Sequence, residues 1–159
     1  MRHRLRLLVL GSLSWMGCVR YLGPPPRRLA GADVRVVGCL DIGVGAPSDP
    51  VFAFDVANTC PYPVAVEFRN LVVRAWSADG TEQRTAPCDP RGELFPAQLD
   101  GHDVERVVLA YPVDTPTRRF CVDVARLNVD APAPHPVEVC FHAYGGGTFA
   151  SESAAERSP

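Results

Sequence analysis

The sequence predicts an all-β protein built as one antiparallel β-sandwich of about seven strands. Three observations predict it. Several short segments alternate apolar and polar residues with a period of two, which is typical of strands with one buried face and one solvated face. The segments between them contain Pro, Gly, Asp and Ser in combinations that favour turns. The 16 prolines are spread along the chain and disfavour long helices.

Six segments carry this alternation, and their apolar positions form the predicted core. In chain order they are Leu40, Ile42 and Val44; Phe52, Phe54 and Val56; Val64, Val66 and Phe68; Val107, Leu109 and Tyr111; Phe120, Val122 and Val124; and Val137, Val139 and Phe141. The third alternation then changes phase, because the next apolar positions are 71, 73 and 75. A regular strand cannot change phase without exposing its buried face. We therefore predict a β-bulge or a strand break at Arg69–Asn70.

The two ends of the chain differ in composition from this predicted domain, which covers residues 33–144. Residues 18–32 include three consecutive prolines and no periodic pattern, which predicts an extended linker that tethers the domain. Residues 145–159 begin with three glycines and continue with small and polar residues. This composition predicts a disordered tail.

The first 17 residues have the features of a secretory signal peptide. Cationic residues at 2–6 precede an apolar run at 7–16, and this run is shorter than the roughly 20 residues that span a bilayer. The following Gly17–Cys18 resembles the cleavage and lipid-attachment point of bacterial lipoproteins. The resemblance implies an acylated Cys18 in the cell envelope and, because Val19 follows, in the outer membrane of a Gram-negative bacterium. Cleavage after Ala32 is the alternative and implies a secreted or periplasmic protein.

Charge narrows the choice of partners. Without residues 1–17 the chain has 13 arginines, no lysine and 18 acidic residues, which gives a net charge of −5. An acidic chain is a poor match for nucleic acid. The expected partners are the membrane, through the lipid, and a protein of the envelope.

The five cysteines after Cys18 are predicted to form disulfides, because exported proteins fold in an oxidising compartment. Five is an odd number, so two bridges leave one thiol. We expect Cys39 to pair with Cys140, which would join the first and last strands. Cys60 with Cys121 is the second expected pair, and Cys88 is left free in a loop.

A metal site is the alternative use of these cysteines. The alternation places three of them on the outward faces of strands, with a histidine nearby, and two thiolates, an imidazole and a carboxylate suit tetrahedral zinc. The residues of this alternative site are Cys39, Cys121, Cys140 and His142.

The sequence contains few residues in patterns that are typical of catalytic sites. Neither Ser48 nor Ser77 lies in a Gly-x-Ser-x-Gly motif, and both His102–Asp103 and His135 fall in predicted loops. We therefore predict no enzymatic activity, no catalytic residues and no cofactor. Trp76 lies at the outward-facing end of a predicted strand and is a candidate contact for a partner.

Three features resemble immunoglobulin-like modules of bacterial envelope proteins. They are the strand ending at Asn58, the long arm 64–76 and the turn at Gly101 before 104–111. The resemblance implies a non-enzymatic binding module, here exported and lipid-anchored. Two alternatives stay open: a metal-binding envelope protein, and an inhibitor or accessory subunit of an envelope enzyme.

Overall fold

The computed structural model describes residues 19–21, 33–48, 51–89, 92, 94–113, 116–144 and 148–152. The predicted signal peptide, Cys18 as the predicted site of lipid attachment, and residues 22–32 lie outside the described residues. The fold is all-β and the strands pair in an antiparallel arrangement, as the alternation predicted.

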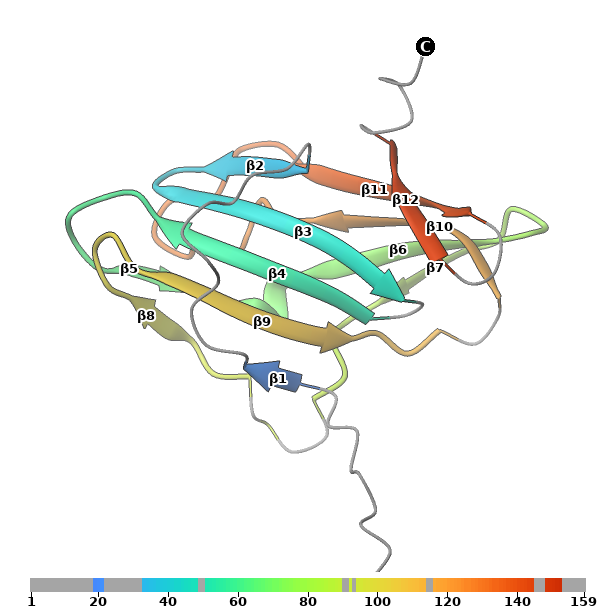
Figure 1. The fold of residues 1–159 in the computed structure, drawn as a ribbon, viewed down its shortest axis with the longest axis horizontal. Helices are drawn as coiled ribbons and strands as arrows, with labels where there is room; N and C mark the ends of the chain where they lie inside the picture. Colours follow the sequence, from blue (N-terminus) through green and yellow to red (C-terminus); the bar gives the residue numbers. More distant parts are fainter. Residues whose placement is uncertain are drawn as a thin grey trace, which may run out of the picture.

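Two five-stranded sheets lie one behind the other, and a small sheet closes one end (Figure 1). The first sheet contains, in spatial order, β1 (Val19–Tyr21), β9 (Val104–Ala110), β4 (Val51–Asn58), β3 (Leu40–Ser48) and β2 (Val34–Val37). The second contains β12 (Thr148–Ser151), β11 (Glu138–Tyr144), β10 (Thr117–Asp123), β6 (Val72–Ser77) and β7 (Glu82–Thr85). The two-stranded sheet pairs β5 (Val64–Val66) with β8 (Ala97–Leu99).

The core lies between the two large sheets and consists of the residues that the alternation marks. Every predicted core position is buried except Val137, which is partly buried and packs against the others. Phe52 of β4 contacts Phe120 of β10 and Phe141 of β11, with ring centroids 5.4 and 5.9 Å apart. Burying each such ring contributes roughly 1.5–3 kcal/mol. These cross-sheet contacts hold the two layers together.

The predicted interruption at Arg69–Asn70 is confirmed as a strand break. β5 ends at Val66, a 3₁₀ helix spans Phe68–Asn70, and β6 begins at Val72. The Glu67 carboxylate caps the short helix by accepting a hydrogen bond from the Arg69 N–H. The break absorbs the change of phase, because Phe68 before it and Leu71 after it are both fully buried.

The expectation of about seven strands is wrong, since the described strands fill two five-stranded sheets and a two-stranded sheet. The additional strands are short and lie at sheet edges or in the small sheet. Val19–Tyr21, predicted as part of the linker, forms β1 and pairs with β9. Thr148–Ser151, predicted as disordered tail, forms β12 on the edge of β11, where Phe149 packs against Phe120 at a centroid distance of 4.9 Å.

Candidate functional site on the outer face of the second sheet

The outer face of the second sheet gathers charged side chains from several of its strands. Because Val73, Ala75, Phe120 and Val122 point into the core, their neighbours on the same strands point outward. We call this surface the outer face. It comprises Glu82 and Arg84 on β7; Arg74 and Trp76 on β6; Arg119, Cys121 and Asp123 on β10; Glu138, Cys140 and His142 on β11; and Glu152 after β12.

Trp76 lies between two arginines on this face. The register places Arg119 opposite Trp76, and Arg74 precedes it on the same side of β6. The guanidinium carbons of Arg74 and Arg119 lie 5.0 and 4.9 Å from the centre of the indole ring. Cation–π contacts of this length fix the ring in place. The outward position of Trp76 therefore agrees with the sequence analysis, while its role as a partner contact stays a prediction.

Ion pairs link neighbouring strands across the outer face. Arg74 donates to Glu138 of β11, with 2.5 Å between Nη2 and Oε1. Arg119 holds Glu152 through two hydrogen bonds of 2.6 and 3.2 Å. The hydrogen bond from Arg119 is the main cause that lowers the pKa of Glu152 below its ordinary value. His142 completes this group, with Nε2 at 2.9 Å from Oε1 of Glu152.

A groove of about 470 Å³ opens at the end of this face where β6 begins and β10 ends. We call it the arginine groove, because three arginines line it. Its lining consists of Asn70, Val72, Arg74, Arg84, Asp123, Arg126, Pro136 and Glu138. The groove cannot be predicted from the sequence, because Arg74, Arg84 and Arg126 meet only through the pairing of β6 with β7 and β10.

The two carboxylates in the groove are already engaged within the chain. Glu138 pairs with Arg74. Oδ1 of Asp123 accepts hydrogen bonds from the backbone N–H groups of Ala125 and Val137 at 2.9 and 3.0 Å.

Two of the arginines keep their charge available to a ligand. Arg126 is exposed and forms no ion pair with any residue that the structure describes. Arg84 pairs with Glu82 at 3.2 Å, but its side chain stays 71% exposed. The groove therefore presents positive charge to solvent, although the net charge of the whole chain is negative.

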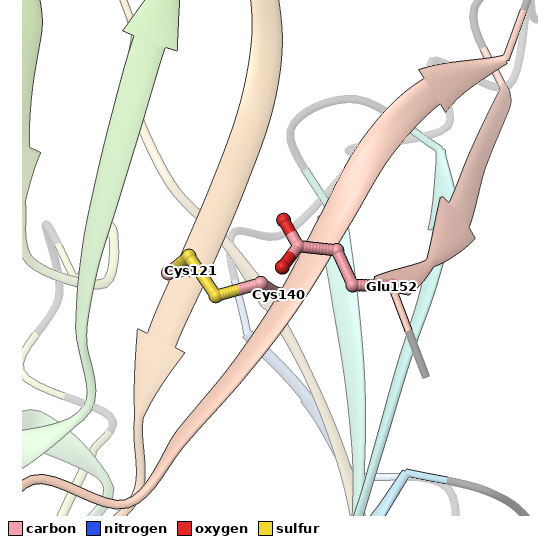
Figure 2. A group of neighbouring side chains, drawn as sticks. All are labelled: Cys121, Cys140 and Glu152. Carbon is pink, nitrogen blue, oxygen red and sulfur yellow. A yellow bond between two sulfur atoms is a disulfide. The ribbon is translucent and has the colours of Figure 1, made fainter. Parts of the chain in front are cut away.

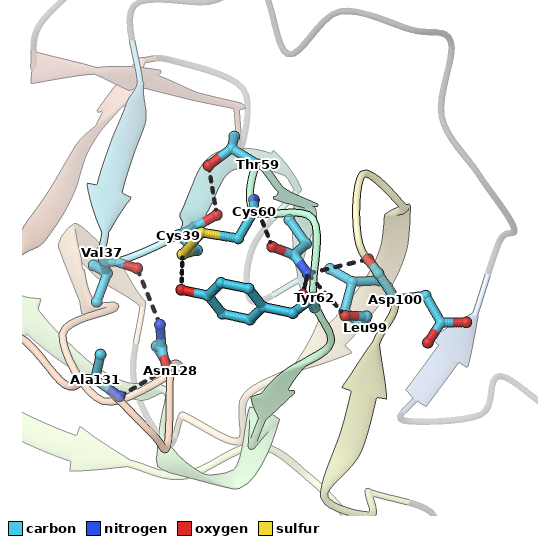
Figure 3. Close-up of a disulfide and its surroundings, with 10 residues drawn as sticks. Val37, Cys39, Thr59, Cys60, Tyr62, Leu99, Asp100, Asn128 and Ala131 are labelled. Carbon is cyan, nitrogen blue, oxygen red and sulfur yellow. Dashed lines mark hydrogen bonds between the residues drawn. A yellow bond between two sulfur atoms is a disulfide. The ribbon is translucent and has the colours of Figure 1, made fainter.

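The disulfides differ from the predicted pairs. Cys121 is bonded to Cys140 (Figure 2) and Cys39 to Cys60 (Figure 3), so the expected pairs Cys39–Cys140 and Cys60–Cys121 are wrong. Cys88 is also disulfide-bonded, which corrects the expectation of a free thiol.

Strand register explains the observed pairs. Leu40 pairs with Asn58 at the end of the β3–β4 hairpin, which brings Cys39 and Cys60 together just beyond it. Cys121 and Cys140 are direct partners on β10 and β11. Both bridges join cysteines that follow one another in the sequence at separations of 21 and 19 residues. Pairing of successive antiparallel strands is the signal that could have predicted them.

Only some of the residues of the alternative metal site lie close together in the structure. One oxygen of Glu152 and the sulfurs of Cys121 and Cys140 lie within 4.8 Å of one another (Figure 2). His142 contacts the same carboxylate. Cys39 is bonded to Cys60 and does not belong to this group, so the predicted ligand set is wrong at that position.

The residues considered for catalysis lie in turns and loops of the structure. His102 is exposed between β8 and β9 in a left-handed backbone conformation with φ of 64°, and its N–H donates to the carbonyl of Cys60. Asp103 accepts a hydrogen bond from the N–H of Val104. Ser77 donates to Asp79 in the β6–β7 turn, and His135 is an exposed loop residue.

Among the residues that the structure describes, no helix has the length and apolar character needed to cross a bilayer. A comparison of the chain with protein-family models, with curated proteins and with solved structures finds no match.

Proposed function

We propose that the protein is a non-enzymatic binding module of the cell envelope, and that its arginine groove binds an acidic segment of a partner protein. The groove is the observation that carries the proposal. Arg84 and Arg126 present charge to solvent there, while the carboxylates beside them are engaged within the chain. Guanidinium groups bind carboxylates with paired hydrogen bonds, so a segment rich in Asp or Glu is the matching ligand.

The charge of the rest of the chain favours a local acidic segment over a nucleic acid. The net charge of −5 repels a long polyanion at a distance, whereas a short acidic segment meets only the groove. The half-buried Trp76 lies on the same outer face, one side-chain position beyond Arg74, and offers an aromatic surface to the same partner.

Export is supported by the state of the cysteines. Each cysteine that the structure describes is disulfide-bonded, and structural disulfides are typical of oxidising compartments. The signal peptide of residues 1–17, lipid attachment at Cys18 and a place in the outer membrane belong to the same proposal. The likeness to immunoglobulin-like modules also belongs to it, and two stacked antiparallel sheets support that likeness.

The proposal is tested with defined peptides on the purified exported protein. We expect a hexaglutamate peptide to bind and a hexalysine peptide not to bind. Reversing both exposed charges (Arg84→Glu with Arg126→Glu) should weaken hexaglutamate binding about tenfold or more, the equivalent of about 1.4 kcal/mol. Fluorescence anisotropy at low and at moderate salt measures the affinity, which should fall as salt rises.

Arg118→Glu is the matched control, because Arg118 is exposed near the start of β10, whereas the groove lies where β10 ends. The proposal fails if the wild-type protein does not distinguish the two peptides, or if Arg118→Glu weakens binding as much as the groove variant. The alternative of an inhibitor or accessory subunit stays a prediction. The same groove variant tests it once a partner enzyme has been captured from the envelope.

A further inference from the structure

The Cys121–Cys140 disulfide lies beside two other metal-ligating side chains. The Glu152 carboxylate extends over it from the end of β12 (Figure 2), with one oxygen within 4.8 Å of both sulfurs. His142 follows Cys140 by two residues on β11 and therefore shares its face of the sheet. The contact of 2.9 Å between Nε2 of His142 and Oε1 of Glu152 places the imidazole beside this carboxylate, next to the group formed by Glu152 and the two sulfurs.

We propose that reduction of this disulfide creates a zinc site whose ligands are Cys121, Cys140, Glu152 and His142. A dithiol reductant of the envelope supplies two electrons and two protons, its own sulfurs become a disulfide, and the Cys121–Cys140 bond opens to two thiols. Zn²⁺ then displaces the thiol protons, which pass to water, and binds two thiolates, a carboxylate oxygen and an imidazole nitrogen.

The strands hold the two cysteines directly opposite each other, with their Cα atoms 4.1 Å apart. On tetrahedral zinc, with bonds of about 2.3 Å, two thiolates lie about 3.8 Å apart, which suits a pair of such close neighbours. The ladder between β10 and β11 pairs residues 119–123 with residues 138–142, so backbone hydrogen bonds continue to hold the two strands after the covalent bond opens. Cys140 is partly exposed, which gives a reductant access to the bond.

The charges around the group suit a metal with two thiolates. Arg119 donates two hydrogen bonds to the Glu152 carboxylate and holds it beside the disulfide. Two thiolates and one carboxylate carry more negative charge than Zn²⁺ neutralises. The guanidinium group of Arg119 beside Glu152, and that of Arg74 opposite Cys121, offset the remainder.

This site differs from the zinc site that the sequence suggested, because Glu152 replaces Cys39. It also differs from the rest of the proposed function, because it requires no partner protein. Zinc would bind only after reduction, and the oxidised protein would bind none.

Cobalt(II) replaces zinc as the probe, because its absorption bands report thiolate ligands directly. The purified exported protein is titrated with Co²⁺ before and after treatment with a phosphine reductant, and Zn²⁺ is then added to displace the cobalt. We expect one Co²⁺ per reduced chain and none per oxidised chain. Glu152→Gln and His142→Ala should each weaken binding about tenfold or more.

Two cysteine variants locate the site, because the reductant also opens the other disulfides. Reduced Cys39→Ser/Cys60→Ser should bind cobalt like the wild type, and reduced Cys121→Ser/Cys140→Ser should bind none. The proposal is overturned if reduced wild-type protein binds no cobalt, or if the Cys121→Ser/Cys140→Ser variant still binds it. It is also overturned if both Glu152→Gln and His142→Ala leave the affinity unchanged. Glu152→Gln and His142→Ala keep the test valid if a cysteine variant does not fold, because His142 and Glu152 lie on the outer face.

Discussion

At the scale of single residues, Asn58 joins the segments at the end of the molecule that carries the Cys39–Cys60 disulfide. Asn58 is buried, with 2% of the residue surface exposed. Its amide nitrogen donates to the carbonyls of Tyr62, Leu99 and Asp100 at distances of 2.7, 3.0 and 3.1 Å, and its oxygen accepts from the N–H of Cys60. One amide therefore joins the end of β4, the loop after it and the end of β8.

We expect Asn58→Asp to destabilise the fold by about 3 kcal/mol or more. The substitution replaces an amide that donates to three carbonyls with a carboxylate oxygen that repels them, in a site without access to water. Urea denaturation measures the change in the free energy of unfolding. Asn70→Asp is the control, because Asn70 is exposed and its amide makes a single hydrogen bond, to the carbonyl of Arg126. Equal losses for the two variants would contradict the role given to Asn58.

At the scale of strands, the sequence predicted long alternations well and short edges poorly. Val107, Leu109 and Tyr111 repeat often enough to define a buried face. The phase change near Asn70 predicts a β-bulge or a break, and the structure has a break. β1 and β12 contain three and four residues, which is too few to establish a period. They form strands because unpaired edges of β9 and β11 are available in the folded state, and this availability cannot be read from local sequence.

The candidate sites were predicted less well than the core, for a related reason. Cys121, Cys140 and His142 were correctly placed on one face, because the alternation gives the direction of each side chain. The strand register decides which residues lie opposite one another on neighbouring strands. This register cannot be read from the sequence. Glu152 joined the group only because β12 pairs with β11, and the arginine groove formed only because β6 lies between β7 and β10.

The attachment of β12 should depend on pH through Glu152. The pKa of Glu152 in the folded state lies below its ordinary value of 4.5, mainly because of the hydrogen bond from Arg119. The ionised carboxylate therefore stabilises the folded state fully above pH 4.5, and this stabilisation is lost as the pH falls through the lower folded pKa. Both side chains are about a third exposed, so solvent screening limits the effect to about 0.5–1 kcal/mol.

Glu152→Gln tests this expectation. At pH 7 the variant should be less stable than the wild type by that amount, and the difference should shrink as the pH falls below 4.5. Urea denaturation at pH 7 and at a series of lower pH values measures it, and limited proteolysis reports whether β12 opens first. Glu82→Gln is the control, because the partner of Glu82, Arg84, is mostly exposed. A stability difference that is unchanged at low pH would contradict the assignment to the ionised carboxylate.

At the scale of the whole molecule, the N-terminal strand and the loop containing Cys88 meet at β9. Val19, the residue after Cys18, pairs with Leu109, and the N–H of Cys88 donates to the carbonyl of Ala110 at 2.8 Å. Cys88 is disulfide-bonded. The pairing of β1 and the hydrogen bond from Cys88 therefore place both segments along β9.

We expect a signal peptidase II inhibitor to increase the size of the protein recovered from cells, because the proposed lipid attachment at Cys18 requires removal of residues 1–17. Mass spectrometry of the intact protein measures this size. Peptide mass mapping after alkylation without a reductant should find Cys88 and Cys39 protected, because both are disulfide-bonded. Alkylation of Cys88 under these conditions would contradict its bonded state, and a mature size unaffected by the inhibitor would contradict the lipid anchor itself.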